Sequence, residues 1–118
     1  MGFIPINKPS LGEREKKAVR EVLDSGMLTD SSYEGGKHVR EFEGKLSSLL
    51  RVKHAIAVNS GTAALQTSLM AYNVKAGDEV IIPAFTFEAT ANVVVACNAR
   101  PVFADIQSDY TIDPVVAF

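Results

Sequence analysis

The sequence has 118 residues, 47% of them hydrophobic, and its 12 basic and 14 acidic side chains give a net charge of −2 at pH 7. These values are typical of one small globular domain and argue against nucleic acid or a membrane as a partner. Cys97 is the single cysteine and residues 1–8 lack the apolar core of a signal peptide, so a cytoplasmic location is expected.

Residues 1–53 are predicted to form a helical segment, with ten basic and eight acidic side chains. Ser10 and Glu13 have the spacing of a capping box, and Gly26 is placed to end the helix that follows. A polar loop over residues 25–36 leads to a second helix. Apolar residues recur on one face of each helix: Val19, Val22 and Leu23 in the first, and Val39, Phe42, Leu46, Leu49 and Leu50 in the second. This pattern predicts two amphipathic covering helices.

Residues 54–118 carry only two basic and six acidic side chains, and they alternate between short apolar runs and helical patterns. Strands are predicted at 54–58, 79–82 and 101–105, and helices at 62–73 and 86–96. This βαβαβ order predicts an α/β fold with a parallel sheet. Asp113 and Pro114 have the pattern of a helix start. Only four residues follow Pro114, so the sequence is expected to stop inside an element.

A candidate phosphate site lies where the first predicted strand meets its helix, at Ser60, Gly61 and Thr62. Free backbone N–H groups and the positive end of the helix dipole attract anions at such a junction, and two hydroxyl groups add further donors. The alternative is a plain helix cap. The pattern is neither a Walker loop nor a dinucleotide-binding fingerprint.

A second candidate position follows the next predicted strand, where Phe87 could face the ring of a cofactor. The alternative is an aromatic residue that fills the core. Glu88 is interpreted as a surface residue. His38 and His54 stand on different elements, so no metal site is predicted, and Cys97 reads as a small apolar residue near a helix end.

Several motifs together resemble the DegT/DnrJ/EryC1/StrS family of pyridoxal-phosphate-dependent sugar aminotransferases. They are Ser25–Thr29, Gly36–Val39, Phe42–Glu43, Asn59–Leu65, Gly77–Val80, Pro83–Asn92 and Pro101–Asp105. The resemblance implies a partial aspartate-aminotransferase-type large domain, with residues 1–53 as a helical segment and 54–118 as the first part of the cofactor-binding domain. It covers the amino-terminal part of a full-length member.

The resemblance implies pyridoxal 5′-phosphate as the cofactor, with Gly61 and Thr62 at its phosphate and Phe87 stacked on its ring. Thr29 matches a segment near the substrate entrance. The implied reaction moves an amino group from glutamate to a nucleotide-linked keto sugar, and the implied assembly is a homo-oligomer. The family's Schiff-base lysine lies beyond position 118, so no catalytic residue is assigned here and residues 1–118 alone are expected to be inactive.

Two alternatives remain open from the sequence. One is a non-catalytic phosphate-binding or interaction module, either half of a split enzyme or a regulator of a full-length relative. The other is a flavodoxin-like domain whose loop at Ser60–Thr62 binds a different phosphate. Lys75 is the only lysine after residue 53, and it is predicted at the opposite end of the sheet from that loop.

Overall fold

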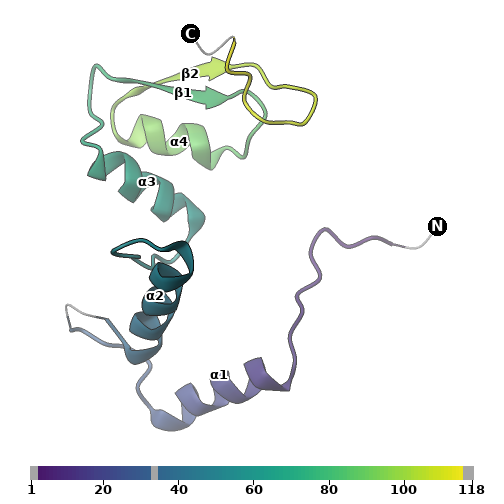
Figure 1. Ribbon diagram of the computed structural model, residues 1–118, viewed down its shortest axis with the longest axis vertical. Helices are drawn as coiled ribbons and strands as arrows, with labels where there is room; N and C mark the ends of the chain where they lie inside the picture. The colour runs from purple at the N-terminus through teal and green to yellow at the C-terminus, as the bar shows by residue number, and fades with distance from the viewer. Residues whose placement is uncertain (1–2, 33–34, 116–118) are drawn as a thin grey trace. The chain divides into compact units, whose positions relative to one another are not determined.

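The computed structural model describes residues 3–32 and 35–115. The chain divides into two units, the first reaching to Ala55 and the second beginning at Ile56. The described residues form four helices and two strands, and Figure 1 labels them in chain order. Each unit is described separately below.

The first helix, α1 (Glu13–Ser25), begins after Gly12. The backbone N–H of Gly12 donates a hydrogen bond of 2.7 Å to Oε2 of Glu15, and this bond lowers the pKa of the Glu15 carboxyl. The predicted capping box of Ser10 and Glu13 is wrong. The helix starts at Glu13, and the N–H of its capping residue Gly12 donates to Glu15 instead. Gly26 ends the helix as predicted, with a left-handed φ of 67°.

The second helix, α2 (Lys37–Leu50), follows Gly36 and ends at Arg51, which has a left-handed φ of 55°. Both predicted helices are confirmed, but no residue of either one is buried. Phe42, for example, is 54% exposed and Leu49 is 77% exposed. What the two apolar faces cover therefore stays a prediction.

The second unit contains α3 (Gly61–Ala71), β1 (Glu79–Pro83), α4 (Ala89–Ala96) and β2 (Arg100–Ala104). The two strands are parallel, with a register that runs from Glu79 opposite Arg100 to Pro83 opposite Ala104. Figure 1 shows α4 beside the sheet that it connects, and α4 contacts both strands. The predicted α/β class with parallel strands is confirmed.

The segment from His54 to Val58 is not a strand, so the prediction of three strands is wrong for the described residues. A strand needs a neighbour to accept and donate its backbone hydrogen bonds, and the sheet of the described residues pairs β1 with β2 only. A short apolar run gave this segment the pattern of a strand, but the sheet of the described residues does not include it.

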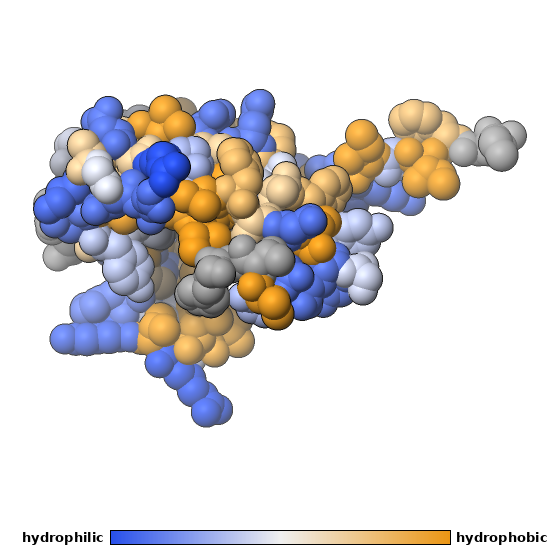
Figure 2. Space-filling view, turned by 90° about the horizontal axis from the view of Figure 1, so that it is seen from above, coloured by the Kyte–Doolittle hydropathy of each residue, from blue (hydrophilic) through white to orange (hydrophobic). Residues whose placement is uncertain are grey.

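A small core holds the second unit together. Ile82 of β1 and Val94 of α4 are 3% and 1% exposed, and they pack with Ala99. Leu69 and Val74 lie against this cluster, which brings α3 onto the same core. Many other large apolar side chains are exposed, and Figure 2 shows them interspersed with hydrophilic ones on the surface.

The chain turns back on itself after β2. Ile106 and Ile112 form an antiparallel bridge, and the N–H of Gln107 donates to the carbonyl of Thr111. Asp113 then accepts a hydrogen bond of 2.8 Å from the N–H of Val115, as expected of a capping residue. The helix predicted to follow falls on residues 116–118, which lie outside the described residues. None of the helices in the described ranges has the length and hydropathy needed to cross a membrane.

Candidate cofactor-phosphate and ring site

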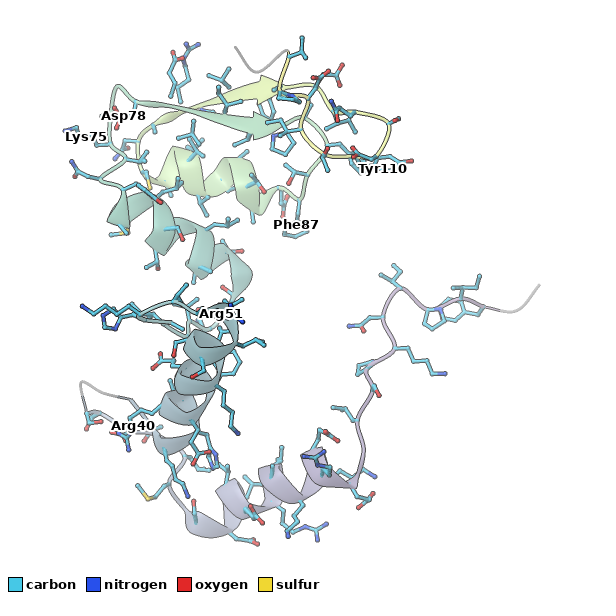
Figure 3. The ribbon with its side chains drawn as sticks, viewed as in Figure 1. Arg40, Arg51, Lys75, Asp78, Phe87 and Tyr110 are labelled. Carbon is cyan, nitrogen blue, oxygen red and sulfur yellow. The ribbon has the colours of Figure 1, made fainter. Side chains whose placement is uncertain are left out.

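A hollow of about 530 Å³ lies in the second unit, between the amino-terminal part of α3 and the segment that joins β1 to α4. It brings together three of the residues singled out from the sequence, Gly61, Thr62 and Phe87. The other residues that line it are Ala64, Leu65, Ser68, Ala89 and Thr90. Figure 3 labels Phe87 at the end of the sheet toward which the strand arrows point. This is where ligands of open parallel sheets bind.

The start of α3 is fixed by Ser60. Its backbone is extended, and its hydroxyl oxygen accepts a hydrogen bond of 3.1 Å from the N–H of Ala63. The Ser60 carbonyl accepts the N–H of Ala64, at 3.0 Å. Ser60 therefore caps the helix, which is the alternative that the sequence left open, and it is not among the residues that line the hollow.

The backbone N–H groups of Gly61 and Thr62 donate to no described residue, because they belong to the first turn of α3. Both residues are exposed and line the hollow. Two adjacent free donors at the positive end of a helix favour an anion at this position. The Thr62 hydroxyl, on the same residue, is a further donor.

Phe87 is 74% exposed, so the sequence alternative of an aromatic residue that fills the core is wrong for the described residues. Its carbonyl accepts the N–H of Thr90 at 3.0 Å. The hydroxyl groups of Thr86 and Thr90, one on either side of Phe87, lie 2.9 Å apart and share a hydrogen bond. An exposed ring in a tied backbone is suited to stacking on a planar ligand.

Sequence reasoning gave no role to five residues that line the hollow. Three of them, Ala64, Leu65 and Ser68, follow Gly61 at helical spacing, and this spacing alone would have placed them on one face with it. Ala89 and Thr90 belong to the first turn of α4 and lie within the Pro83–Asn92 motif. None of the residues that line the hollow is ionisable in the ordinary pH range.

An aromatic contact involves Phe85, two residues before Phe87. The rings of Phe85 and Tyr110 have centroids 5.7 Å apart and planes inclined at 42°. Tyr110 stands in the loop after β2, next to Asp109, whose carboxylate accepts hydrogen bonds from the N–H and the hydroxyl of Thr111 at 3.0 and 2.7 Å. These two bonds lower the pKa of the Asp109 carboxyl.

Thr29 is not brought into this hollow. It belongs to the first unit, where it lines a separate cavity of about 620 Å³ between the end of α1 and the start of α2. Asp30 lies beside it, and hydrogen bonds from the side chain and the N–H of Ser32 lower the pKa of the Asp30 carboxyl. The role of Thr29 in substrate binding stays a prediction.

Lys75 lies at the end of the sheet opposite to Phe87 (Figure 3), where its N–H donates to Asp78. Glu88 is exposed, in agreement with its interpretation as a surface residue, and Cys97 is half-buried at the end of α4. Within residues 3–32 and 35–115, no three His, Cys, Asp or Glu side chains are grouped so as to hold a metal ion.

Proteins of known sequence are similar to this chain over most of its length. GDP-perosamine synthase of Vibrio cholerae is 41% identical over 107 residues, which are 91% of this chain and 28% of that protein. The spore coat polysaccharide biosynthesis protein SpsC of Bacillus subtilis (strain 168) is 43% identical over 114 residues, 96% of this chain and 28% of that protein. The chain thus spans a little over a quarter of these relatives.

Among solved structures, the putative sugar aminotransferase Spr1654 from Streptococcus pneumoniae in its PMP form matches with a TM-score of 0.85 and 35% identity. The match covers 98% of this chain and 29% of that one. The PLP form of the same protein matches with a TM-score of 0.81 and 37% identity, over 93% of this chain and 27% of that one.

The family model for DegT/DnrJ/EryC1/StrS aminotransferases matches residues 9–117. This range includes the start of α3, the segment around Phe87 and the loop after β2. The chain belongs to the DegT/DnrJ/EryC1/StrS aminotransferase family.

Proposed function

We propose that this chain supplies the phosphate cradle and one ring-binding face for pyridoxal 5′-phosphate in a sugar aminotransferase. The proposed reaction transfers an amino group from glutamate to a nucleotide-linked keto sugar, in a homo-oligomeric enzyme. The observation that carries the proposal is that Gly61 and Thr62 line one hollow with Phe87, which is distant from them in the sequence. The similarity to Spr1654, solved in a PLP form and a PMP form, adds support.

The residues at the start of α3 fit a phosphate group. The backbone N–H groups of Gly61 and Thr62 have no acceptor among the described residues, and they lie at the positive end of the α3 dipole, which favours an anion. The Thr62 hydroxyl adds a donor, and no acidic side chain lines the hollow to oppose a negative charge. Ser60 acts one step away, since its bond to Ala63 fixes the turn that presents these donors.

The other wall of the hollow fits a planar ring. Phe87 offers an exposed aromatic face, and Ala64, Leu65 and Ala89 give the lining an apolar character. A volume of about 530 Å³ lies within the usual range for small-molecule sites. A pyridine ring stacked on Phe87 would be oriented by it and shielded from water on that face.

When bound, pyridoxal phosphate supplies an electron sink for the carbon that exchanges its amino group. The residues of this hollow bind and orient, and none of them is placed to hold or move a proton in the ordinary pH range. Lys75 is at the other end of the sheet and does not supply an amine here. We therefore propose that the 118 residues alone bind the cofactor without transferring an amino group.

The proposal is tested in a chimera. Residues 9–117 replace the aligned segment of GDP-perosamine synthase from Vibrio cholerae, and the purified product is assayed for bound cofactor by absorbance and for amino transfer from glutamate. We expect cofactor binding and turnover. Thr62→Val should weaken cofactor binding by about tenfold to a hundredfold, as expected for a lost hydrogen bond to a charged group.

Two further variants complete the test. Phe87→Ala should raise the dissociation constant for the cofactor about threefold to tenfold, through loss of ring stacking. Thr67→Val is the matched control, since Thr67 is exposed on α3 and does not line the hollow. A chimera that folds without binding cofactor, or a Thr67→Val effect equal to that of Thr62→Val, would overturn the proposal. Binding by the 118-residue chain with no turnover in the chimera would favour a non-catalytic module.

A further inference from the structure

The loop that follows β2 makes a contact that the cofactor site does not explain. Tyr110, at the tip of this loop, packs its ring against Phe85, and it is the one aromatic pair among the described residues. Figure 3 labels Tyr110 and Phe87 at the same end of the sheet. Phe85 stands two residues before Phe87, so the contact reaches the segment that carries the proposed ring face.

Burial does not account for this pair. Phe85 is 67% exposed and Tyr110 is 70% exposed, so neither ring gains much from removal of apolar surface from water. Tyr110 also has a left-handed backbone, with φ of 67°, which is disfavoured for a residue with a Cβ atom. Such a conformation persists where the surrounding structure determines it, and it is concentrated at functional sites.

The loop itself is tied in several places. The N–H of Tyr110 donates to the carbonyl of Gln107, and Asp109 accepts two hydrogen bonds from Thr111. The Ile106 to Ile112 bridge closes the base of the loop. The backbone that carries the Tyr110 ring is therefore held in place by these hydrogen bonds and by the bridge.

The segment from β1 to α4 is tied on its other side. Thr90 donates its N–H to the Phe87 carbonyl, and its hydroxyl shares a hydrogen bond with Thr86. On the side before Phe87, the N–H of Ala84 donates to the Ala104 carbonyl at 2.8 Å. Between Ala84 and Thr86, the ring of Phe85 contacts Tyr110.

We infer that Tyr110 is a positioning residue, whose contact with Phe85 sets the orientation of the Phe87 side chain at the cofactor-ring face. The inference rests on the proposed function for the role of that face, but the positioning itself can be measured without cofactor. Tyr110 is not among the residues that line the hollow, and its ring contact is with Phe85.

The first measurement uses the 118-residue chain without cofactor. Three-bond scalar couplings of Phe87, measured by NMR, report the populations of its side-chain rotamers. Tyr110→Ala should spread Phe87 over more rotamers, whereas Tyr110→Phe should restore the wild-type distribution because it keeps the ring. Tyr72→Ala is the matched control, since Tyr72 is 86% exposed at the opposite end of α3 and has no ring partner among the described residues.

The second measurement is cofactor binding, by equilibrium dialysis with pyridoxal 5′-phosphate and by the circular dichroism of the bound cofactor. Tyr110→Ala should raise the dissociation constant about threefold to tenfold and change the dichroic band, with Tyr110→Phe and Tyr72→Ala unchanged. Phe85→Leu should reproduce Tyr110→Ala, and the double variant should be no worse than either single one.

The outcomes of these two measurements distinguish the positioning role of Tyr110 from the proposed function. An unchanged Phe87 rotamer distribution in a folded Tyr110→Ala chain overturns the positioning role, whatever the cofactor does. Failure of the wild-type chain and the chimera to bind pyridoxal 5′-phosphate overturns the proposed function while the couplings still decide the role of Tyr110. If Tyr110→Ala does not fold, the Phe85→Leu chain provides the same comparison, and an unchanged Phe87 there overturns the inference.

Discussion

The Ser60 hydroxyl oxygen accepts a hydrogen bond of 3.1 Å from the N–H of Ala63, at the start of α3. This bond satisfies one of the amino-terminal donors of the helix and leaves those of Gly61 and Thr62, two residues that line the hollow, without an acceptor among the described residues. The Ser60 side chain thus divides the amino-terminal donors of α3 into two groups. The N–H of Ala63 stabilises the helix, and the N–H groups of Gly61 and Thr62 remain for a ligand.

Substitution of Ser60 should reveal these two tasks separately. Ser60→Ala removes the cap and should lower the free energy of unfolding by about 1 kcal/mol, measured by urea denaturation. Ser60→Asp keeps an acceptor for Ala63 and should keep the stability, but its negative charge should weaken phosphate binding, measured by dialysis. Loss of binding in Ser60→Ala with full binding in Ser60→Asp would contradict this assignment.

Gly61→Ala tests whether the glycine serves the ligand or the fold. A Cβ atom added at Gly61 meets nothing within 4 Å, and the backbone there is not left-handed. We expect stability to stay the same or rise by up to about 1 kcal/mol, as is usual when Ala replaces Gly in a helix. Binding of pyridoxal 5′-phosphate should weaken, because the new methyl group stands where the ligand approaches. A stable variant with unchanged binding would show that close approach at Gly61 is not needed.

The loop at Asp109 should respond to acid. Hydrogen bonds from the N–H and then the hydroxyl of Thr111 lower the pKa of Asp109 in the folded chain. A depressed pKa means that the carboxylate stabilises the loop above the unfolded value of about 3.9, and that this contribution is lost as pH falls through the lower folded pKa. Carbon-13 NMR titration of the Asp109 carboxyl checks the direction.

Thr111→Val is the sharper variant of the same test. It removes the hydroxyl donor and keeps the backbone one, so the pKa of Asp109 should rise partway toward its ordinary value. The Tyr110 ring signals should change over the same pH range as the carboxyl. An Asp109 pKa that is unchanged in Thr111→Val would contradict the contribution of the hydroxyl.

Two adjacent valines in α4 offer a matched pair for the core. Val94 is 1% exposed and packs with Ile82 and Ala99, whereas Val95 is 57% exposed. Val94→Ala should lower the free energy of unfolding of the second unit by about 2 kcal/mol, through lost apolar burial and a small cavity. Val95→Ala should have an effect near zero, because the Val95 side chain is exposed. It is the matched control, since both variants share the change in helix propensity. Equal effects in urea denaturation would show that this core does not stabilise the unit.

Much of the fold was accessible from the sequence because its signals were local. Gly26 ends a helix through its own left-handed backbone, and Pro83 ends a strand because it lacks an N–H group. The conformation of residues 54–58 could not be predicted in this way. Their short apolar run is a local signal, but strand formation depends on a hydrogen-bonding neighbour that the run does not specify.

The candidate site was predicted where backbone and motif coincide. Gly61 and Thr62 could be placed at a helix start from spacing, and Phe87 after a strand, so their meeting at one end of the sheet follows from parallel topology. The contact of Phe85 with Tyr110 could not be predicted, because it depends on how the loop after β2 folds back. Loop conformation of this kind is set by a few hydrogen bonds, here those of Asp109.

The parallel register between β1 and β2 also bears on how the chain acquires its structure. Glu79 and Arg100 are opposite each other in the sheet, and their side chains form an ion pair across only 21 residues of sequence. The intervening helix α4 supplies Val94 to the shared core, so strand, helix and strand need no distant residues to meet. Short loop closure is entropically inexpensive and fast. This segment is thus suited to be a nucleus of folding, onto which α3 packs through Leu69.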